Sequence, residues 1–225
     1  DMEIKPIAYI RTDYKGKFGI PRQSGLVSTL TAQIVFLPEY RNPDALRGIE
    51  QYSHLWLIWE FSEVKRGGWT PTVRPPRLGG NTRMGVFATR SPFRPNPLGL
   101  SVVKLEGIAN TQDGAVINVS GADLLDGTPI YDIKPYLQYV DSIPDASNGF
   151  ALASSEGTLS VDIPEEHLCK IPAEKREGLR DVLAQDPRPQ YQHEPERVYT
   201  MSFGDFEVSF IVDGGTLTVT DISKR

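Results

Sequence analysis

The segment His54-Leu55-Trp56-Leu57-Ile58-Trp59-Glu60-Phe61 is the most apolar stretch in this chain of 225 residues. Its aromatic and β-branched residues are typical of a β-strand. A membrane-spanning helix needs roughly 20 apolar residues, and this segment has eight, so it is too short to cross a bilayer as a helix. We therefore predict that it is a strand of a soluble protein.

Five further runs of similar composition lie in the first 140 residues and are bounded by Gly, Pro or Asn. They are Ile4–Ile10, Ala32–Leu37, Arg83–Ala88, Leu98–Ile108 and Ala115–Ser120. One short helix is predicted between them, with Asn42 as its N-cap and Pro43 at its first position, ending between Arg47 and Gly48. Many short strands and few helices favour an antiparallel barrel or a compact sandwich. The fold prediction is therefore mainly β, with an antiparallel β-barrel-like domain over residues 1–140.

The run Thr70–Gly80 interrupts this pattern because it contains three prolines. Proline has no backbone N–H to donate to a sheet, so this run cannot lie in a central strand. We predict an ordered loop across the mouth of the barrel.

The remaining third of the chain differs in composition from the first 140 residues. Residues 141–157 are rich in small and polar residues and are predicted to be a linker. A small α+β domain over residues 158–225 is predicted to follow it. Its expected elements, in chain order, are a strand at Leu159–Ile163, a helix at Ala173–Gln185, a proline-stiffened loop at Asp186–Tyr191, strands at Arg197–Phe203 and Phe206–Val212, a turn at Asp213–Gly215 and a strand at Thr216–Ile222.

Composition excludes several classes of protein. The single cysteine, Cys169, cannot form an internal disulfide, and no segment is long and apolar enough to span a membrane, so a cytoplasmic protein is expected. The Gly-x-Gly-x-x-Gly fingerprint of Rossmann-type sites and the Walker-type phosphate loop are both absent. The three histidines, His54, His167 and His193, are scattered without metal-ligand spacing, so no metal is expected.

Charge is segregated along the chain. The formal net charge is −5, yet residues 64–105 contain no Asp or Glu and eight Lys or Arg, which leaves −13 for the rest. A cationic face on an otherwise acidic protein suits the binding of phosphates. The alternative is that these arginines pair with acidic residues from other segments; the length of the acid-free run favours a functional role.

Two blocks carry most of the chemistry. The first, Pro71–Gly99, is dense in Pro, Gly and Arg, and includes Arg94-Pro95-Asn96-Pro97. Such a frame fixes loops and can present arginine forks to carboxylate or phosphate. The second, Asp123–Tyr136, combines three aspartates, a lysine and two tyrosines, which could serve as acid–base groups. It is also typical of an Asp-Gly turn between two strands, in which Gly127 serves the turn.

Together these blocks resemble the TrmO family (TsaA-like or YaeB), the tRNA adenine-N6 methyltransferases that act beside the anticodon. The resemblance spans nearly the whole chain, from Lys17–Gln23 through Arg47–Glu50, Ser53–Trp56 and both blocks to Gln185–Tyr191. It implies a β-barrel methyltransferase unrelated to Rossmann types, a small C-terminal domain, a homodimer and S-adenosylmethionine as the methyl donor. It also implies that the substrate is N6-threonylcarbamoyladenosine in tRNA, methylated on N6.

The resemblance also assigns residues. Those that match donor-contacting positions of the family are Pro21, Arg22, Gln23, Ser62, Glu63, Arg90, Leu100, Asp123, Leu124, Asp126, Gly127 and Thr128. For the acceptor, N6 attacks well only as its proton leaves, so we hypothesise that Asp126 or Asp132 accepts this proton. Lys134 and Tyr136 would then orient the base or its carbamoyl group.

The anticodon arm is predicted to bind arginines of the acid-free segment, with help from the C-terminal loop. The predicted RNA-binding residues are Arg74, Arg77, Arg83, Arg94, Arg188 and Tyr191. For the last two, an inter-domain ion pair and a packing tyrosine are equally good readings. Three rival functions stay open at this point: a regulator that binds S-adenosylmethionine as a signal, an RNA-binding barrel without a donor, and a methyltransferase acting on another substrate.

Overall fold

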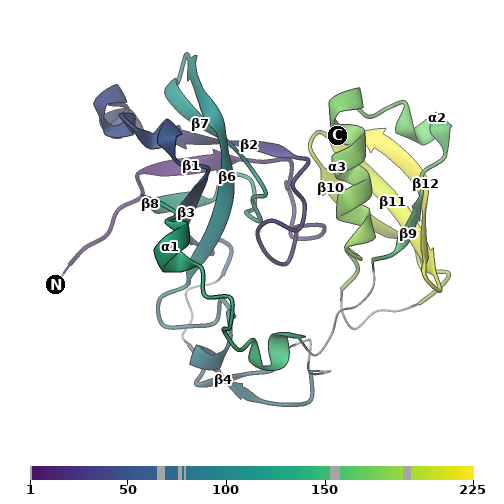
Figure 1. The fold of residues 1–225 in the computed structure, drawn as a ribbon. Helices are drawn as coiled ribbons and strands as arrows, with labels where there is room; N and C mark the ends of the chain where they lie inside the picture. Colours follow the sequence, from purple (N-terminus) through teal and green to yellow (C-terminus); the bar gives the residue numbers. More distant parts are fainter. Residues whose placement is uncertain (1, 65–68, 76–77, 79, 153–157, 190–193) are drawn as a thin grey trace.

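The computed structural model describes residues 2–64, 69–75, 78, 80–152, 158–189 and 194–225. Six strands form a closed antiparallel ring in its first part (Figure 1). In spatial order they are β1 (Ala8–Arg11), β2 (Thr31–Phe36), β7 (Gly114–Ser120), β6 (Leu98–Thr111), β3 (His54–Glu60) and β8 (Pro129–Pro135). The ring closes because β1 pairs with both β2 and β8. The predicted mainly β fold, with an antiparallel N-terminal part and a small C-terminal domain, is confirmed.

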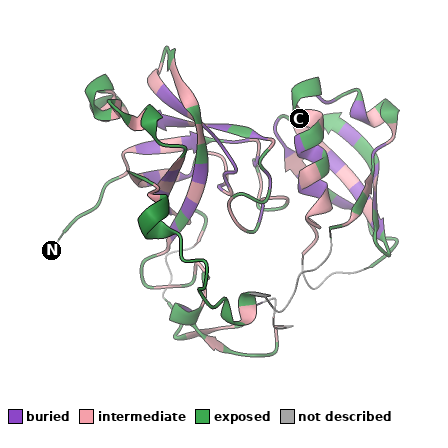
Figure 2. Cartoon of the chain, in the orientation of Figure 1, coloured by how far each residue is buried: buried purple, intermediate pink, exposed green. Residues whose placement is uncertain are grey.

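The interior of the ring is filled by alternate side chains of its strands. On β3, Leu55, Leu57 and Trp59 are buried, and the residues between them are partly exposed. This alternation follows from the two-residue period of a strand. The buried side chains pack against Ile117 and Ile130 from other strands of the ring, and Figure 2 shows the burial concentrated along the strands.

The pairing register of the strands places three of the segments that connect them at the same end of the ring. Glu60 at the end of β3 pairs with Leu98 at the start of β6, and Ile10 near the end of β1 exchanges backbone hydrogen bonds with Gly127 and Thr128 just before β8. Thr31 at the start of β2 pairs with Ser120 at the end of β7. The three connecting segments 12–30, 61–97 and 121–128 therefore leave the ring at the same end.

The short helix predicted after Asn42 is present as a 3-10 helix, η2 (Pro43–Leu46). The Asn42 side chain accepts a hydrogen bond from the Asp44 backbone N–H at 3.0 Å, as an N-cap does. Gly48 then adopts a φ of 86°, which glycine tolerates well, and ends this turn. The 3-10 helices η1 (Pro38–Tyr40) and η3 (Ile49–Gln51) flank it.

Three predictions in the first 140 residues were wrong in detail. The strand expected at Ile4–Ile10 begins only at Ala8 and continues to Arg11 as β1. The strand expected at Arg83–Ala88 is reduced to β5 (Met84–Gly85), followed by the 3-10 helix η5 (Val86–Ala88). The proline-rich run Thr70–Gly80 is not loop throughout, because β4 (Thr72–Val73) pairs with β5. Prolines on both sides of β4 cannot donate to a ladder, which limits this pairing to two residues.

The C-terminal part contains a four-stranded sheet in the order β10 (Tyr199–Phe203), β11 (Phe206–Asp213), β12 (Thr216–Lys224) and β9 (Ser160–Asp162). The pairing is antiparallel except between β12 and β9, and the helix α3 (Ala173–Ala184) crosses one face (Figure 1). Leu179 and Leu183 of α3 are fully buried against this sheet. The short helix α2 (Glu165–Leu168) was not predicted.

The stretch predicted as a linker holds two short helical turns. They are the end of α1 (Gln138–Asp141) and η6 (Gly149–Leu152), while residues 153–157 lie outside the described part. The division into domains at residues 140 and 158 stays a prediction. No helix within the described ranges is long and apolar enough to cross a membrane.

Candidate active site

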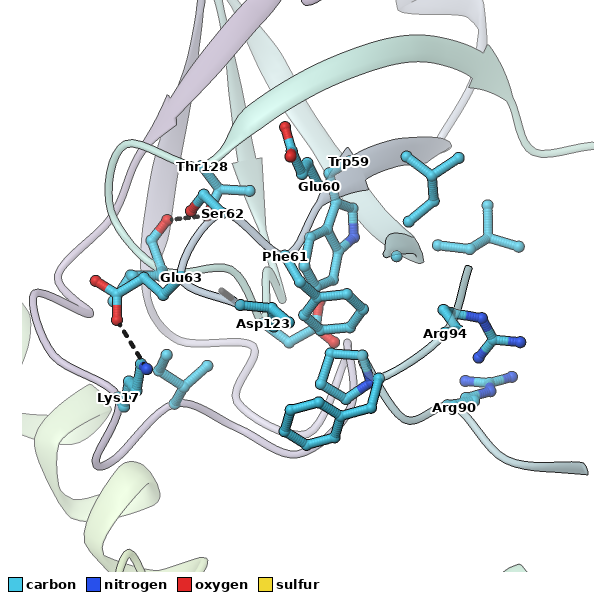
Figure 3. A pocket seen from close by; sticks show the side chains of 18 of the residues that line it. Lys17, Trp59, Glu60, Phe61, Ser62, Glu63, Arg90, Arg94, Asp123 and Thr128 are labelled. Carbon is cyan, nitrogen blue, oxygen red and sulfur yellow. Dashed lines mark hydrogen bonds and ion pairs between the residues drawn. The ribbon is translucent and has the colours of Figure 1, made fainter. Parts of the chain in front are cut away.

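A cavity of about 1000 Å³ opens at the end of the ring where the connecting segments meet. Its volume is at the upper end of the range of about 300–1000 Å³ that small-molecule sites occupy. Its walls come from four stretches: residues 17–23, 59–64, 89–100 and 123–128. Figure 3 shows the side chains around it, with the aromatic rings of Trp59 and Phe61 at the centre. These two rings meet edge to face with their centroids 4.4 Å apart.

A chain of two hydrogen bonds joins the Trp59 ring to Asp123 through Ser101. The indole Nε1–H of Trp59 donates to Ser101 Oγ at 3.0 Å, and Ser101 Oγ–H donates to Asp123 Oδ1 at 2.6 Å. Ser101 is only 1% exposed, although serine is usually a surface residue. This chain fixes the orientation of both the Trp59 ring and the Asp123 carboxylate, and both residues line the cavity.

The electrostatic state of Asp123 is unusual for an aspartate. Burial raises the pKa of its carboxyl group, and the hydrogen bond from Ser101 and the positive charge of Arg90 offset this effect only in part. A carboxylate with a raised pKa is a stronger base than an ordinary one. Asp123 can therefore accept a proton from a ligand in the cavity more readily than an exposed aspartate can.

Cationic groups lie on the opposite sides of the aromatic centre. In Figure 3, Arg90 and Arg94 lie on one side of the rings, and the ion pair of Lys17 with Glu63 lies on the other. The Arg90 guanidinium donates to Gln23 Oε1 at 2.6 Å, which ties segment 89–100 to segment 17–23. The Arg94 guanidinium donates to the carbonyl oxygens of Thr89 and Ser91 and so stiffens its own loop.

Gly99 lies directly against the Trp59 ring. A Cβ atom added at Gly99 would lie 2.3 Å from Cε2 and Cζ2 of that ring, so the ring would have to move. We expect Gly99→Ala to lower the free energy of unfolding by about 1–3 kcal/mol, the usual range for overpacking, as measured by urea unfolding.

Gly85→Ala is the matched control for this prediction, because a Cβ at Gly85 meets no atom within 4 Å and its φ of −57° suits alanine. We expect the control to change stability by less than about 0.5 kcal/mol. Equal stability of the two variants would mean that the Trp59 ring is not held where the structure places it.

Nine of the twelve residues predicted to contact the donor line the cavity. They are Pro21, Arg22, Gln23, Ser62, Glu63, Arg90, Leu100, Asp123 and Thr128. The other three support the turn after β7 instead. Leu124 is fully buried in the core of the ring, and Gly127, with a φ of 79°, makes the tight turn expected of Asp-Gly.

Asp126 holds this turn against the end of β1. Its Oδ1 accepts from the backbone N–H of Thr12 at 2.9 Å, and its Oδ2 pairs with Lys15 Nζ at 2.7 Å. The backbone N–H of Asp126 also donates to the Tyr14 carbonyl at 2.8 Å. In this structure Asp126 is thus engaged outside the cavity lining.

Of the other three residues predicted to act in catalysis, Asp132 and Lys134 lie on β8 and Tyr136 directly follows it, and none of the three lines the cavity. Asp132 Oδ2 pairs with Lys134 Nζ at 3.0 Å, and both side chains are substantially exposed. Tyr136 follows β8 and packs against the rings of His54 and Trp56.

The described arginines that were predicted to bind RNA fall into three environments. Arg94 lines the cavity and donates to carbonyl groups of its own loop. Arg74 and Arg83 are exposed, and Arg83 donates to Thr72 Oγ1 at 3.1 Å beside the β4–β5 pair. Arg188 forms a two-pronged ion pair with Asp186, both bonds at 2.8 Å, and its side chain is 9% exposed. Arg77 and Tyr191 lie outside the described residues.

Sequence reasoning missed several residues of the cavity. Trp59, Phe61 and Ser101 were treated as parts of strands without a role in the site, although the first two line the cavity and Ser101 holds Trp59 and Asp123 in place. One signal was available for Ser101, since it is a polar residue at a buried position of β6, between the buried Gly99 and Val103. Within the described ranges, no group of three or more His, Cys, Asp or Glu is arranged to hold a metal ion.

Comparison with known proteins finds similar methyltransferases. The family described as tRNA-methyltransferase O N-terminal domain matches residues 9–142, and the TrmO C-terminal domain matches residues 158–225. The tRNA (adenine(37)-N6)-methyltransferase of Escherichia coli K12 is 44% identical over 231 aligned residues, covering 99% of this chain and 98% of that protein. A putative S-adenosylmethionine-dependent methyltransferase, RcsF, of Pseudomonas aeruginosa is 43% identical, covering 91% of this chain and 90% of that protein.

A crystal structure of TrmO from Pseudomonas aeruginosa superposes with a TM-score of 0.80 at 36% identity, covering 100% of this chain and 98% of that one. The ring, its cavity and these matches define an S-adenosylmethionine-dependent methyltransferase. More particularly, the chain belongs to the tRNA-methyltransferase O family.

Proposed function

We propose that this enzyme transfers the methyl group of S-adenosylmethionine to N6 of adenosine 37 in tRNA, and that the adenosine it accepts is N6-threonylcarbamoyladenosine. The observation that carries the proposal is the cavity, which combines arginines, an aromatic centre and a partly buried carboxylate with a raised pKa. The adenosine position is the one named for the relative in Escherichia coli.

The cavity suits the charges of the donor. S-adenosylmethionine carries a carboxylate, an ammonium group and a sulfonium group, and the walls offer groups of both signs, such as Arg22, Arg90 and Glu63. The rings of Trp59 and Phe61 line the cavity and offer an aromatic surface to a sulfonium cation and to an adenine ring. A sulfonium donor needs little chemical activation. Positioning alone can supply roughly 7–11 kcal/mol in well-oriented systems.

The acceptor needs help from a base. The lone pair of N6 in a carbamoylated adenine is spread into the ring and the carbonyl, so N6 attacks well only as its N–H bond breaks. In the proposed step, N6 forms a bond to the methyl carbon, the carbon–sulfur bond breaks with its electrons staying on sulfur, and the N6 proton passes to a carboxylate. We assign this role to Asp123, because it lines the cavity with a raised pKa.

The earlier candidates remain testable alternatives. That Asp126 or Asp132 accepts the proton, and that Lys134 and Tyr136 orient the base, stays a prediction. Asp126 would have to leave its contacts with Thr12 and Lys15 to reach a ligand in this cavity. The other three would need an acceptor that extends along β8.

The surface of the 69–94 segment suits an RNA loop. Trp69 and Phe87 are exposed, and their rings stack with centroids 6.2 Å apart. Exposed aromatic rings among arginines are the usual means of binding unpaired bases and their phosphates. We also propose that the enzyme acts as a homodimer, as the family resemblance implies, and in the cytoplasm, where its tRNA substrate would be processed.

Mass analysis of tRNA nucleosides tests the proposed function. The enzyme is incubated with S-adenosylmethionine and either tRNA that carries N6-threonylcarbamoyladenosine or the same tRNA transcribed without modification. We expect the modified nucleoside to gain one methyl group and the unmodified adenosine to gain none, because the site is proposed to recognise the carbamoyl group. Methylation of both would refute the proposed acceptor, and tight donor binding without methylation of either would favour a regulator.

A further inference from the structure

The long connection between β1 and β2, residues 12–30, has two sides with different neighbours. Lys17, Ile20, Pro21, Arg22 and Gln23 line the main cavity. Other side chains of the same connection, Tyr14, Val27 and Leu30, are buried in the hydrophobic core of the C-terminal domain together with α3 and the β10–β12 sheet. We call this connection the donor loop.

Polar contacts fasten both ends of the donor loop to the C-terminal domain. Near its start, Asp13 accepts from Lys175 Nζ at 2.6 Å through its carboxylate and from the backbone N–H of Gly204 at 2.7 Å through its carbonyl. Near its end, Thr29 Oγ1 donates to Asp181 Oδ2 at 2.7 Å. The Asp13 side chain is only 13% exposed, so this ion pair is more than a surface contact.

Two glycines allow the apolar surfaces to meet. A Cβ added at Gly178 on α3 would lie 2.2 Å from Leu30 Cδ2, which shows that the leucine sits directly on the helix backbone. On the donor loop, Gly19 has a φ of 82°, and a Cβ there would lie 2.8 Å from Met201 Cε on β10. The loop and the C-terminal domain are therefore closely fitted at two points.

We propose that the C-terminal domain positions the donor loop, and that the affinity for the methyl donor depends on α3 and β10 even though neither supplies a wall of the cavity. Among the described residues that line the main cavity, none belongs to residues 158–225. Lys175 and Gly178 are thus positioning residues that act through Asp13 and Leu30. The inference rests on the proposal that this cavity holds the donor.

The physical basis is preorganisation. A loop of this length that is free in solution loses conformational entropy when a ligand orders it, and this loss weakens binding. Docking on the C-terminal domain orders the loop before the donor arrives. If a substitution lowers the fraction of molecules with an ordered loop, the apparent Kd for the donor rises by the inverse of that fraction, and turnover at saturating donor changes little.

Gly178→Ala tests this inference in the full-length enzyme. We expect the Kd for S-adenosylmethionine, measured by calorimetry, to rise by about tenfold, as it would if the ordered fraction fell to about one tenth, with kcat at saturating donor nearly unchanged. Adding Leu30→Ala removes the atoms that the new methyl group meets, so the double variant should bind the donor more tightly than Gly178→Ala alone. Gly215→Ala is the matched control in the same domain, because a Cβ at that position meets no atom within 4 Å.

Lys175→Met provides a second test that does not disturb helix packing, because this side chain is partly exposed. It should also raise the donor Kd while far-UV circular dichroism stays that of the wild type. Wild-type Kd values in both folded variants would overturn the inference. Failure of the wild-type enzyme to bind S-adenosylmethionine would instead refute the proposed function, so the two failures can be told apart.

Discussion

Asp123→Asn should lower kcat by roughly 10²–10⁴-fold, the usual contribution of a general base, while the enzyme still binds S-adenosylmethionine. Asparagine keeps the size of the side chain and can still accept the hydrogen bond from Ser101, but it cannot take a proton from N6. Single-turnover methylation of modified tRNA measures the chemical step, and calorimetry measures donor binding separately.

Two matched variants compare Asp123 with the rival bases. Asp126→Asn and Asp132→Asn remove carboxylates that do not line the cavity, and we expect both to retain most of the turnover. Near-normal activity of these two would refute the prediction that either accepts the proton. Near-normal turnover of Asp123→Asn would refute the present assignment.

The pH dependence of the wild type gives an independent check on Asp123. The base acts in its ionised form, so the rate should rise as the pH increases through its pKa. Because burial raises that pKa, the midpoint of the rise should lie above about 3.9, the value of an ordinary aspartate. The rise at this midpoint should vanish in Asp123→Asn.

Binding of tRNA should weaken by roughly 10²-fold between 50 and 200 mM salt. For a single-stranded loop, the logarithm of the binding constant falls by about 0.7 per neutralised phosphate for each tenfold increase in salt, and the estimate assumes about five contacts. Fluorescence anisotropy of a labelled anticodon stem–loop over this range measures the slope. A binding constant that does not change with salt would show that the arginines of the acid-free segment do not contact tRNA phosphates.

Single substitutions test which arginines contribute to the salt dependence of tRNA binding. Arg83→Gln should reduce it by about 0.7, because Arg83 is exposed and bound to a hydroxyl group instead of a carboxylate. Arg47→Gln is the control, since Arg47 lies outside the acid-free segment and is paired with Asp44. Equal slopes for both variants would show that Arg83 does not contact phosphate.

Local patterns predicted much of the fold. Strand β3 was foreseen within one residue because its composition and alternation are local properties, and the cap at Asn42 was foreseen because its hydrogen bond spans two residues. Strand β8 was implied by the Asp-Gly turn between two strands but was given no bounds, because Asp132 and Lys134 interrupt its apolar pattern and its strand character comes from pairing with β1 and β3. The 3-10 turn at Val86–Ala88 was read as a strand from composition alone.

Less of the site than of the fold could be predicted from the sequence. Nine of the residues that the motif match predicted to contact the donor line one cavity, because those motifs lie in the connections at one end of the ring. The hydrogen bonds from Trp59 through Ser101 to Asp123 span up to 42 residues and depend on register, which no local pattern encodes. The docking of the donor loop on α3 is also non-local, since Leu30 and Gly178 are distant in sequence.

The burial of Trp59 gives the enzyme a built-in optical reporter. The chain has three tryptophans, and Trp59 is 7% exposed at the cavity, whereas Trp69 is 49% exposed and Trp56 packs on the outer side of the ring. An enzyme in which Trp56 and Trp69 are replaced by phenylalanine would emit from Trp59 alone. Its fluorescence would then follow arrival of the donor and departure of the product in real time, without a label.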